Sequence, residues 1–385
     1  MSTLRTDTIV DYLGGNNTTV NGVTLNYGVL SREDRIINGD FAIWERRTAN
    51  SVTFGDTTAT TSNSYGVDRW RNAYIGGAVS QQRRNFTLDD TMIGMNTPKH
   101  FLRQIVSGQS LESHFALTTQ RIESVRSYAG QTITVLGWAR RSSGAGNMAV
   151  NIGQYFGSGT TNASVTIPAS DSIVVPGQTV TLSNTWEPFA VTFDVPSIVG
   201  KRIGIFYDDD WLEINFWTSA GSDFAMASNS LGVQTISADL WGIHIKRGTH
   251  NASVTDQYYP RDIGTELAAC QRYFNTFGGY RFSTGDYERS GMGQAYSSIS
   301  AEVMVSFPVL LRKIPTLSYT GNWGLSNSVM GVLPVTSIVP DSTTRRSINL
   351  QVTAAAGGLV AGNATQFFTN NDNFGSCMLN FDAEL

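Results

Sequence analysis

The sequence predicts an all-β protein: a jelly-roll β-sandwich and a smaller C-terminal β-domain, joined by one short helix. Three observations support this. The chain of 385 residues contains 38 glycines and 11% aromatic residues, which suits many short strands joined by tight turns. Charged residues make up only 15%, whereas about a quarter is typical, so coiled coils and long surface helices are not expected. Several segments alternate apolar and polar residues, as antiparallel strands with one buried face do.

Residues 1–35 form a polar leader. Two short alternating segments, residues 5–10 and 18–25, flank a turn of glycines and asparagines at residues 14–17. An isolated hairpin buries little and is only marginally stable. We therefore expect the leader to be disordered or to dock on another chain, where copies of itself or a partner protein supply strand pairing.

Residues 36–262 show the clearest two-residue period and are predicted to form the jelly roll. Alternation is strong in residues 189–195 and 212–217. Residues 132–139 are apolar on both faces near their end, which predicts a central strand. In residues 241–246 the period places Trp241 on the core face with Ile243 and Ile245. Many such strands with polar turns between them indicate a sandwich or jelly roll.

Residues 263–279 change to a helical period. The apolar positions of one stripe are Leu267, Cys270, Phe274 and Phe277. Gly278-Gly279 would end such a helix as a C-cap. We predict a linking helix here, followed by the smaller β-domain over residues 280–385. Alternation returns there, and the apolar terminal segment is expected to pair inside a sheet.

Charge and composition exclude several classes of function. The net charge of −4 gives no basic field for nucleic acid or anionic lipid. The sequence contains no apolar run of 18 residues and no signal-type leader, so we expect synthesis in a cytoplasm and no membrane insertion. Cys270 and Cys377 are expected to be reduced core thiols. The four histidines lack metal-ligand spacing, and nucleotide-binding and hydrolase motifs are absent from the sequence.

Short motifs follow one another along most of the chain. They are residues 36–41 (IINGDF), Trp44 with Arg46, and residues 68–70 (DRW), 120–123 (QRIE), 129–131 (AGQ), 137–140 (GWAR), 186–189 (WEPF), 196–201 (PSIVGK), 267–274 (LAACQRYF), 307–309 (FPV), 315–316 (PT) and 382–385 (DAEL). This ordered set resembles a family of bacteriophage virion proteins, the tail-fibre, tail or head-fibre components that carry a jelly roll like that of carbohydrate-binding modules. Residues 2–9 (STLRTDTI) resemble the virion-attaching start of many phage fibres.

The resemblance implies a virion protein that is oligomeric, often trimeric, and sometimes a glycan binder, without one shared enzymatic activity. We therefore expect a non-enzymatic tail fibre located in the virion. It would dock on other virion proteins through residues 1–35, form a homotrimer and present its β-domains to host-surface polysaccharide. Two alternatives stay open: a head-decorating or collar fibre without a glycan site, and a capsular polysaccharide depolymerase.

Two groups of residues are candidates for glycan contact: Asp68-Arg69-Trp70 and Asp209-Asp210-Trp211. A tryptophan beside an arginine can stack on a sugar ring. Adjacent aspartates at a turn can bind hydroxyl groups or a cation, and a glycosidase needs two carboxylates at a defined separation. The alternative for the first group is a core tryptophan with an Asp-Arg pair that braces a strand end. For the second group it is a solvated acidic turn.

The resemblance also implies a metal site, because jelly rolls of this kind often hold a structural calcium between the first and last strands. Asp40 and Asp239 are the candidate ligands. The alternative is that Asp40 fixes a turn while Phe41 and Trp44 lie in the core. The sequence contains no acidic cluster with calcium-loop spacing, and we expect no other cofactor.

Overall fold

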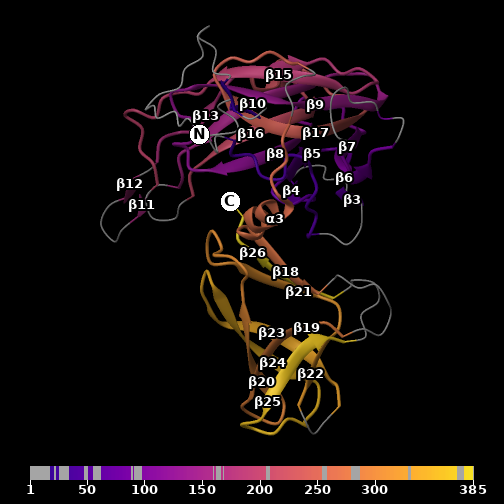
Figure 1. Cartoon of the computed structure of the whole chain (residues 1–385), viewed down its shortest axis with the longest axis vertical. Helices are drawn as coiled ribbons and strands as arrows, with labels where there is room; N and C mark the ends of the chain where they lie inside the picture. The colour runs from indigo at the N-terminus through magenta and orange to yellow at the C-terminus, as the bar shows by residue number, and fades with distance from the viewer. Residues whose placement is uncertain are drawn as a thin grey trace, which may run out of the picture.

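The protein is built of strands, as predicted. The computed structural model describes the chain except residues 1–17, 21–22, 26–33, 47–50, 55–61, 88–89, 91–97, 159, 162–165, 168, 205–208, 254–257, 279–286, 328–330, 371–376 and 385. A sandwich lies at one end of the molecule and a barrel at the other, with helix α3 between them (Figure 1). Within the described residues, helices are short: α2 (Ala225–Ser228), α3 (Ile263–Gln271) and the 3₁₀ turn η1 (Ser222–Phe224). None of them is long and apolar enough to cross a membrane.

The sandwich consists of two antiparallel sheets. The first contains β4 (Ser62–Tyr65), β5 (Arg71–Ile75), β8 (Phe115–Glu123), β10 (Met148–Tyr155), β13 (Ile173–Val174), β14 (Gln178–Val180) and β16 (Trp211–Ala220). The second contains β3 (Ser51–Phe54), β6 (Ala78–Asn85), β7 (His100–Ser107), β9 (Thr132–Gly144), β15 (Glu187–Asp194) and β17 (Ile236–Arg247). Strand β9 lies between β15 and β17, which confirms the predicted central strand. A two-stranded sheet, β11 (Thr160–Thr161) and β12 (Thr166–Ile167), stands apart.

The main core fills the space between these sheets. It includes Phe41, Trp70, Phe216 and Ile243, each at most 1% exposed. The prediction that Trp241 shares the core face with Ile243 was wrong. The pairing of β17 with β9 shifts register between Trp241 and His244, and such a bulge reverses the alternation. Trp241 therefore packs in a separate aromatic cluster with Phe101, Trp138 and Trp186.

Helix α3 is shorter than the sequence predicts. Asp262 caps it by accepting hydrogen bonds from the backbone N–H groups of Gly264 (3.0 Å) and Thr265 (3.2 Å). It ends at Gln271, and the residues predicted to continue it form strand β18 (Phe274–Gly278). This strand pairs with β26 (Met378–Asp382). Tertiary pairing with a distant strand thus overrides the local helical pattern.

The C-terminal body combines a small sheet and a barrel. In the sheet, β26 lies between β18 and β21 (Thr316–Thr320), so the apolar terminal segment is paired on both sides as predicted. The closed barrel has the order β19 (Arg289–Ala295), β20 (Ser300–Ser306), β24 (Ser347–Ala354), β23 (Leu333–Thr343), β22 (Trp323–Ser326) and β25 (Ala364–Thr369). Both cysteines are buried and free, which confirms the prediction of reduced core thiols.

The leader differs from its predicted form. Residues 18–25 were expected to be one strand, but they hold two, β1 (Thr18–Val20) and β2 (Val23–Leu25), which pair antiparallel. The sequence between them is Asn21-Gly22, the pair most favoured in two-residue hairpin turns. The predicted strand at residues 5–10 and the predicted turn at 14–17 lie outside the described residues.

A cluster of buried charges joins the sandwich to the C-terminal body. We call Arg46, Asp68, Arg69 and Glu384 the junction cluster. Arg46 forms ion pairs with Glu384 (2.9 Å) and, at its margin, with Asp382 (2.8 Å), and Arg69 pairs with Glu384. The side chains of Arg46, Arg69 and Glu384 are at most 8% exposed. Three of the sequence motifs that resemble phage proteins therefore meet at one place.

Aromatic rings and a second charge group complete this junction. The guanidinium of Arg69 lies 3.4 Å from the ring centroid of Tyr273, which follows α3. Glu123, at the end of β8, accepts hydrogen bonds from Arg272 Nη2 (3.0 Å) and from the Tyr273 hydroxyl (2.9 Å). Charged hydrogen bonds of this kind are the stronger ones. They tie the sandwich to the segment that leads into the C-terminal body.

The junction makes stability depend on pH through Asp68. Burial raises the pKa of Asp68 from 3.8 to about 7, although Arg46 opposes the shift. A carboxyl with a raised pKa in the folded state contributes stability below its unfolded pKa and loses it as the pH rises through the folded value. We therefore expect the advantage in unfolding free energy of wild type over Asp68→Asn to shrink by at least about 1 kcal/mol between about pH 5 and about pH 8.

Urea unfolding at the two pH values measures this difference. Asp171→Asn is the matched control, because Asp171 is exposed, and the difference between wild type and this variant should stay constant. An advantage over Asp68→Asn that is unchanged or grows with pH would contradict the prediction.

Candidate functional site

The first predicted glycan group, Asp68-Arg69-Trp70, is buried. Each residue is at most 1% exposed. Trp70 donates from Nε1 to the carbonyl oxygen of Asn38 (2.9 Å), and its ring packs on Phe41 with centroids 5.1 Å apart. These side chains cannot reach a glycan in this structure. The structural alternative is therefore correct: Trp70 belongs to the core, and Asp68 and Arg69 belong to the junction cluster.

The second group, Asp209-Asp210-Trp211, mainly braces turns. Asp210 is 5% exposed and accepts hydrogen bonds from the Ser124 hydroxyl (3.1 Å) and the Val125 N–H (2.8 Å). Asp209 accepts from the Ser158 N–H (2.9 Å). Both carboxylates are thus committed to neighbouring segments. Their predecessor in the predicted turn, Asp208, lies outside the described residues.

Trp211 is the member of this group that keeps a partly exposed face. It stacks on Tyr155 with ring centroids 4.0 Å apart and an angle of 25° between the planes. The guanidinium of Arg121 lies 3.9 Å from the Trp211 ring. The stack occupies one end of the first sheet, where Tyr155 and Trp211 are direct partners in the pairing of β10 with β16.

The predicted calcium ligands have other partners. Both oxygens of the fully buried Asp239 accept from arginines: Arg103 Nε at 2.6 Å and Nη2 at 2.8 Å, and Arg140 Nε at 2.8 Å. Asp40 accepts from the Ala42 N–H (3.3 Å), and burial raises its pKa. A carboxylate held by two guanidinium groups is not free for a cation. In the part of the chain that the structure describes, no group of three His, Cys, Asp or Glu side chains could hold a metal.

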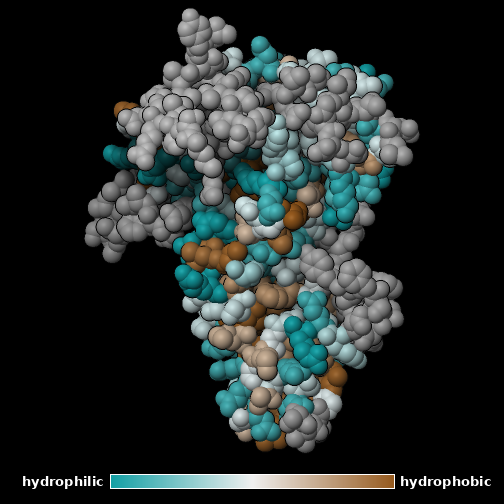
Figure 2. Space-filling view, in the orientation of Figure 1, coloured by the Kyte–Doolittle hydropathy of each residue, from teal (hydrophilic) through white to brown (hydrophobic). Residues whose placement is uncertain are grey.

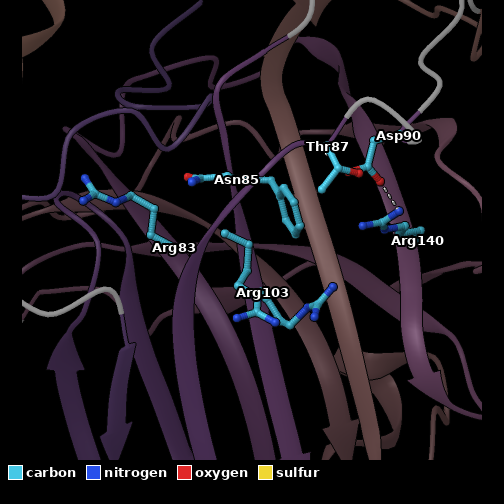
Figure 3. Close-up of a pocket in the computed structure, with 8 residues that line it drawn as sticks. Arg83, Asn85, Thr87, Asp90, Arg103 and Arg140 are labelled. Carbon is cyan, nitrogen blue, oxygen red and sulfur yellow. Dashed lines mark hydrogen bonds and ion pairs between the residues drawn. The ribbon is translucent and has the colours of Figure 1, made fainter.

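The arginines around Asp239 line a hollow on the outer face of the second sheet, which we call the arginine hollow. Its volume is about 470 Å³, within the range of ligand sites. Its walls are formed by Arg83, Arg84, Asn85, Thr87, Asp90, Phe101, Arg103 and Arg140 (Figure 3). The lining contains four arginines and one aspartate, Asp90, and a second carboxylate, Asp239, pairs with Arg103 and Arg140. Arginines thus outnumber carboxylates here, in a chain whose net charge is −4.

Strand alternation explains how these side chains gather. On β7, Leu102 points into the main core, so Phe101 and Arg103 point outward. The register then sets Arg103 opposite Asp239 on β17 and sets Asp239 opposite Arg140 on β9. Three neighbouring strands thus supply an Arg–Asp–Arg row. The buried carboxylate holds both guanidinium planes in place.

A second carboxylate fixes the rim. Asp90 accepts from Arg140 Nη1 (2.5 Å), as the dashed line in Figure 3 shows, and from the Thr87 N–H (2.8 Å). Although burial opposes ionisation, the hydrogen bonds from Thr87 and the charge of Arg140 hold the pKa of Asp90 below its usual value. Asp90 is therefore an ionised partner of Arg140.

An aromatic layer lies beneath the hollow. Phe101 and Trp186 pack edge to face with centroids 5.2 Å apart, and Trp138 and Trp241 belong to the same cluster. The Arg140 guanidinium lies 4.8 Å from the ring of Trp186. The stack of arginine on aromatic rings stiffens the floor. The site can offer hydrogen-bond donors and positive charge to a ligand without large rearrangement.

The chain resembles known proteins only distantly, in structure, and these comparisons assign it to no family. No family model and no curated protein matches the chain. The solved structures that it resembles include the enzymatically active domain of tailspike protein 4 from bacteriophage CBA120, at 14% identity over 56% of this chain and 21% of that chain, with a TM-score of 0.29. The chain thus spans about a fifth of that tailspike domain.

In two further structural matches, the aligned region covers most of the matched protein. A cyclase from Fischerella sp. TAU is 12% identical over 57% of this chain and 98% of its own, with a TM-score of 0.31. The N-terminal cellulose-binding domain of β-1,4-glucanase C from Cellulomonas fimi is 13% identical over 42% of this chain and 87% of its own, with a TM-score of 0.26. Likenesses at these scores indicate neither family nor function.

Proposed function

We propose that this chain is a non-enzymatic structural protein of a bacteriophage virion, of the tail-fibre type, that binds a host-surface polysaccharide in the arginine hollow. The hollow carries this proposal. It is a concave site with several convergent hydrogen-bond donors above an aromatic layer, the usual composition of a ligand site. The sequence motifs that resemble those of phage virion proteins support the proposed location in a virion. Residues 1–35 would dock the chain on the particle, and three copies would assemble.

The charge state of the hollow favours binding over hydrolysis. A glycosidase needs a carboxylic acid with a raised pKa beside a second carboxylate. Burial alone would raise the pKa of Asp90, but the hydrogen bonds from Thr87 and the charge of Arg140 outweigh it and lower that pKa. The carboxylate of Asp239 is held by Arg103 and Arg140. Neither residue is arranged as a general acid. This supports attachment as the role of the site.

The junction supports a mechanical role. Arg46, Arg69 and Glu384 join the two bodies through buried ion pairs, so a ligand held by the sandwich pulls on the C-terminal body through a defined contact. Among the residues drawn in colour in Figure 2, most are hydrophilic or neutral, and the hydrophobic ones form separate patches. Such a surface suits a protein presented to solvent on a particle.

Binding of host polysaccharide tests the function. Purified full-length chain, immobilised on a sensor, should bind polysaccharide extracted from the host, and Asn85→Ala should weaken binding roughly three- to tenfold by removing one hydrogen-bonding group at the hollow. Asn251→Ala, at another exposed asparagine, should leave binding unchanged. Absence of binding to the wild type, or equal effects of the two variants, would overturn the site.

Immunolabelling of particles tests the location separately. Antibody against the chain should mark the tail. Label on the capsid surface or at the collar would replace the tail-fibre proposal with a head-decorating or collar fibre, and absence of label from the particle would reject the virion role.

A further inference from the structure

We infer that the arginine hollow selects an acidic polysaccharide, and that Arg84, Arg103 and Arg140 hold a carboxylate of a uronic acid unit. This inference rests on the proposed function and names the class of glycan. It follows from the donors that remain after the internal ion pairs are formed.

Arg103 and Arg140 retain donors for a ligand. Arg103 uses Nε and Nη2 on Asp239, and Arg140 uses Nε on Asp239 and Nη1 on Asp90. Nη1 of Arg103 and Nη2 of Arg140 have no acceptor within the described residues. Both residues line the hollow. Asp239 is 0% exposed and fixes these guanidinium groups before any ligand arrives, so little ordering is needed on binding.

Arg84 provides an unpaired charge at the mouth of the hollow. It is exposed, lies opposite Phe101 in the pairing of β6 with β7 and lines the hollow. In the described part of the chain it has no hydrogen-bond or ion-pair partner. A long exposed side chain can swing to a ligand, whereas Arg103 and Arg140 supply fixed donors.

The surroundings add further positive charge. Lys99 directly precedes β7 and brings this charge, whereas His100, the first residue of β7, is neutral near pH 7. Burial lowers the pKa of His100 to about 4, and the charges of Arg83 and Lys99 add to the shift. The one carboxylate of the wall, Asp90, is already paired with Arg140. The hollow therefore carries more positive than negative charge, and an anion is the ligand that balances this excess.

A ligand carboxylate suits Arg103 and Arg140, because both guanidinium groups already bind carboxylates of the protein: Asp239 in both cases and Asp90 at Arg140. Arg103 binds Asp239 through two parallel hydrogen bonds of 2.6 and 2.8 Å, the fork geometry that matches a planar carboxylate. A uronic acid presents the same planar group beside hydroxyls that Asn85 and Thr87 can bind. A neutral sugar would leave the excess charge unpaired, and this disfavours it.

Polymers that differ only at the carboxyl group test the inference. Calorimetry with the full-length chain would compare polygalacturonate, alginate and hyaluronate with their carboxyl-reduced forms. We expect at least one acidic polymer to bind about tenfold or more tightly than its reduced form, and its affinity to fall with added salt. Arg84→Gln should lower that affinity about tenfold and leave the reduced form unaffected. Arg346→Gln, the same charge change at an exposed arginine of the barrel, should change neither.

Each other outcome overturns the inference. Equal binding of acidic and reduced polymers, or binding of none of the three acids, excludes carboxylate selection. If host polysaccharide still binds in an Asn85-dependent way, the proposed function survives that failure. Acid binding that Arg84→Gln does not weaken would place the acid site elsewhere. Dextran sulfate that binds as tightly as the best uronate would show general attraction of polyanions instead of recognition of a carboxylate.

Discussion

Replacing Arg69 by methionine should lower the free energy of unfolding by about 3–5 kcal/mol. Arg69 is 1% exposed, pairs with the buried Glu384 and donates from Nη2 to the carbonyl oxygen of Arg121 (2.5 Å). Its removal leaves Glu384 with Arg46 as its remaining cation, and it deprives the partly buried carbonyl oxygen of Arg121 of this hydrogen-bond donor. Urea unfolding measures the loss.

Two controls separate the buried ion pair from general effects of removing an arginine. Arg71→Met removes a half-buried arginine close by and should cost less than about 1 kcal/mol. The double variant Arg69→Met with Glu384→Leu should recover part of the loss, because it also removes the buried carboxylate that has lost one of its two cations. If the losses in unfolding free energy of Arg69→Met and Glu384→Leu simply add in the double variant, the two residues are not coupled.

Replacing Trp70 by alanine should lower the free energy of unfolding by about 3–5 kcal/mol. Trp70 is 0% exposed, and its ring contacts Phe41 and Phe216 with centroids 5.1 and 5.8 Å away. The change opens a large cavity in the main core and leaves the carbonyl oxygen of Asn38 without its Nε1 donor.

Trp211→Ala is the matched comparison, because Trp211 keeps a partly exposed face and makes one aromatic stack. We expect a loss of about 1 kcal/mol from the broken stack. Both variants are compared by urea unfolding against the wild type. A loss at Trp70 no larger than that at Trp211 would mean that Trp70 does not occupy the core as described.

The strands could be predicted from sequence because a two-residue period is local. The alternation of residues 189–195 predicted β15 (Glu187–Asp194), and that of residues 212–217 predicted β16 (Trp211–Ala220). The end of α3 could not be predicted. Phe274 and Phe277 fit a helical stripe, yet they lie on a strand because β26, about a hundred positions away, pairs with them. The bulge beside Gly242 was equally invisible, although its φ of +67° is a conformation that glycine permits.

The candidate site was missed for a related reason. Its arginines come from β6, β7 and β9, and only the register of β7, β17 and β9 sets Arg103, Asp239 and Arg140 side by side. The family resemblance drew attention to Asp239 but implied a calcium ion there. In contrast, Asp68-Arg69-Trp70 was correctly recognised as important, and the core and bracing alternative was the right one, since a tryptophan amid alternating residues is usually buried.

The closed ring of β19, β20, β24, β23, β22 and β25 has a consequence for crowding. A sheet with open edges offers free backbone donors and acceptors that a neighbouring molecule can extend into a fibril. These six strands satisfy one another, so copies held close together on a surface can touch through their side chains without exchanging or adding strands. In dense arrays the barrel should accordingly not be the part of the chain that adds strands or fuses into amyloid-like fibrils.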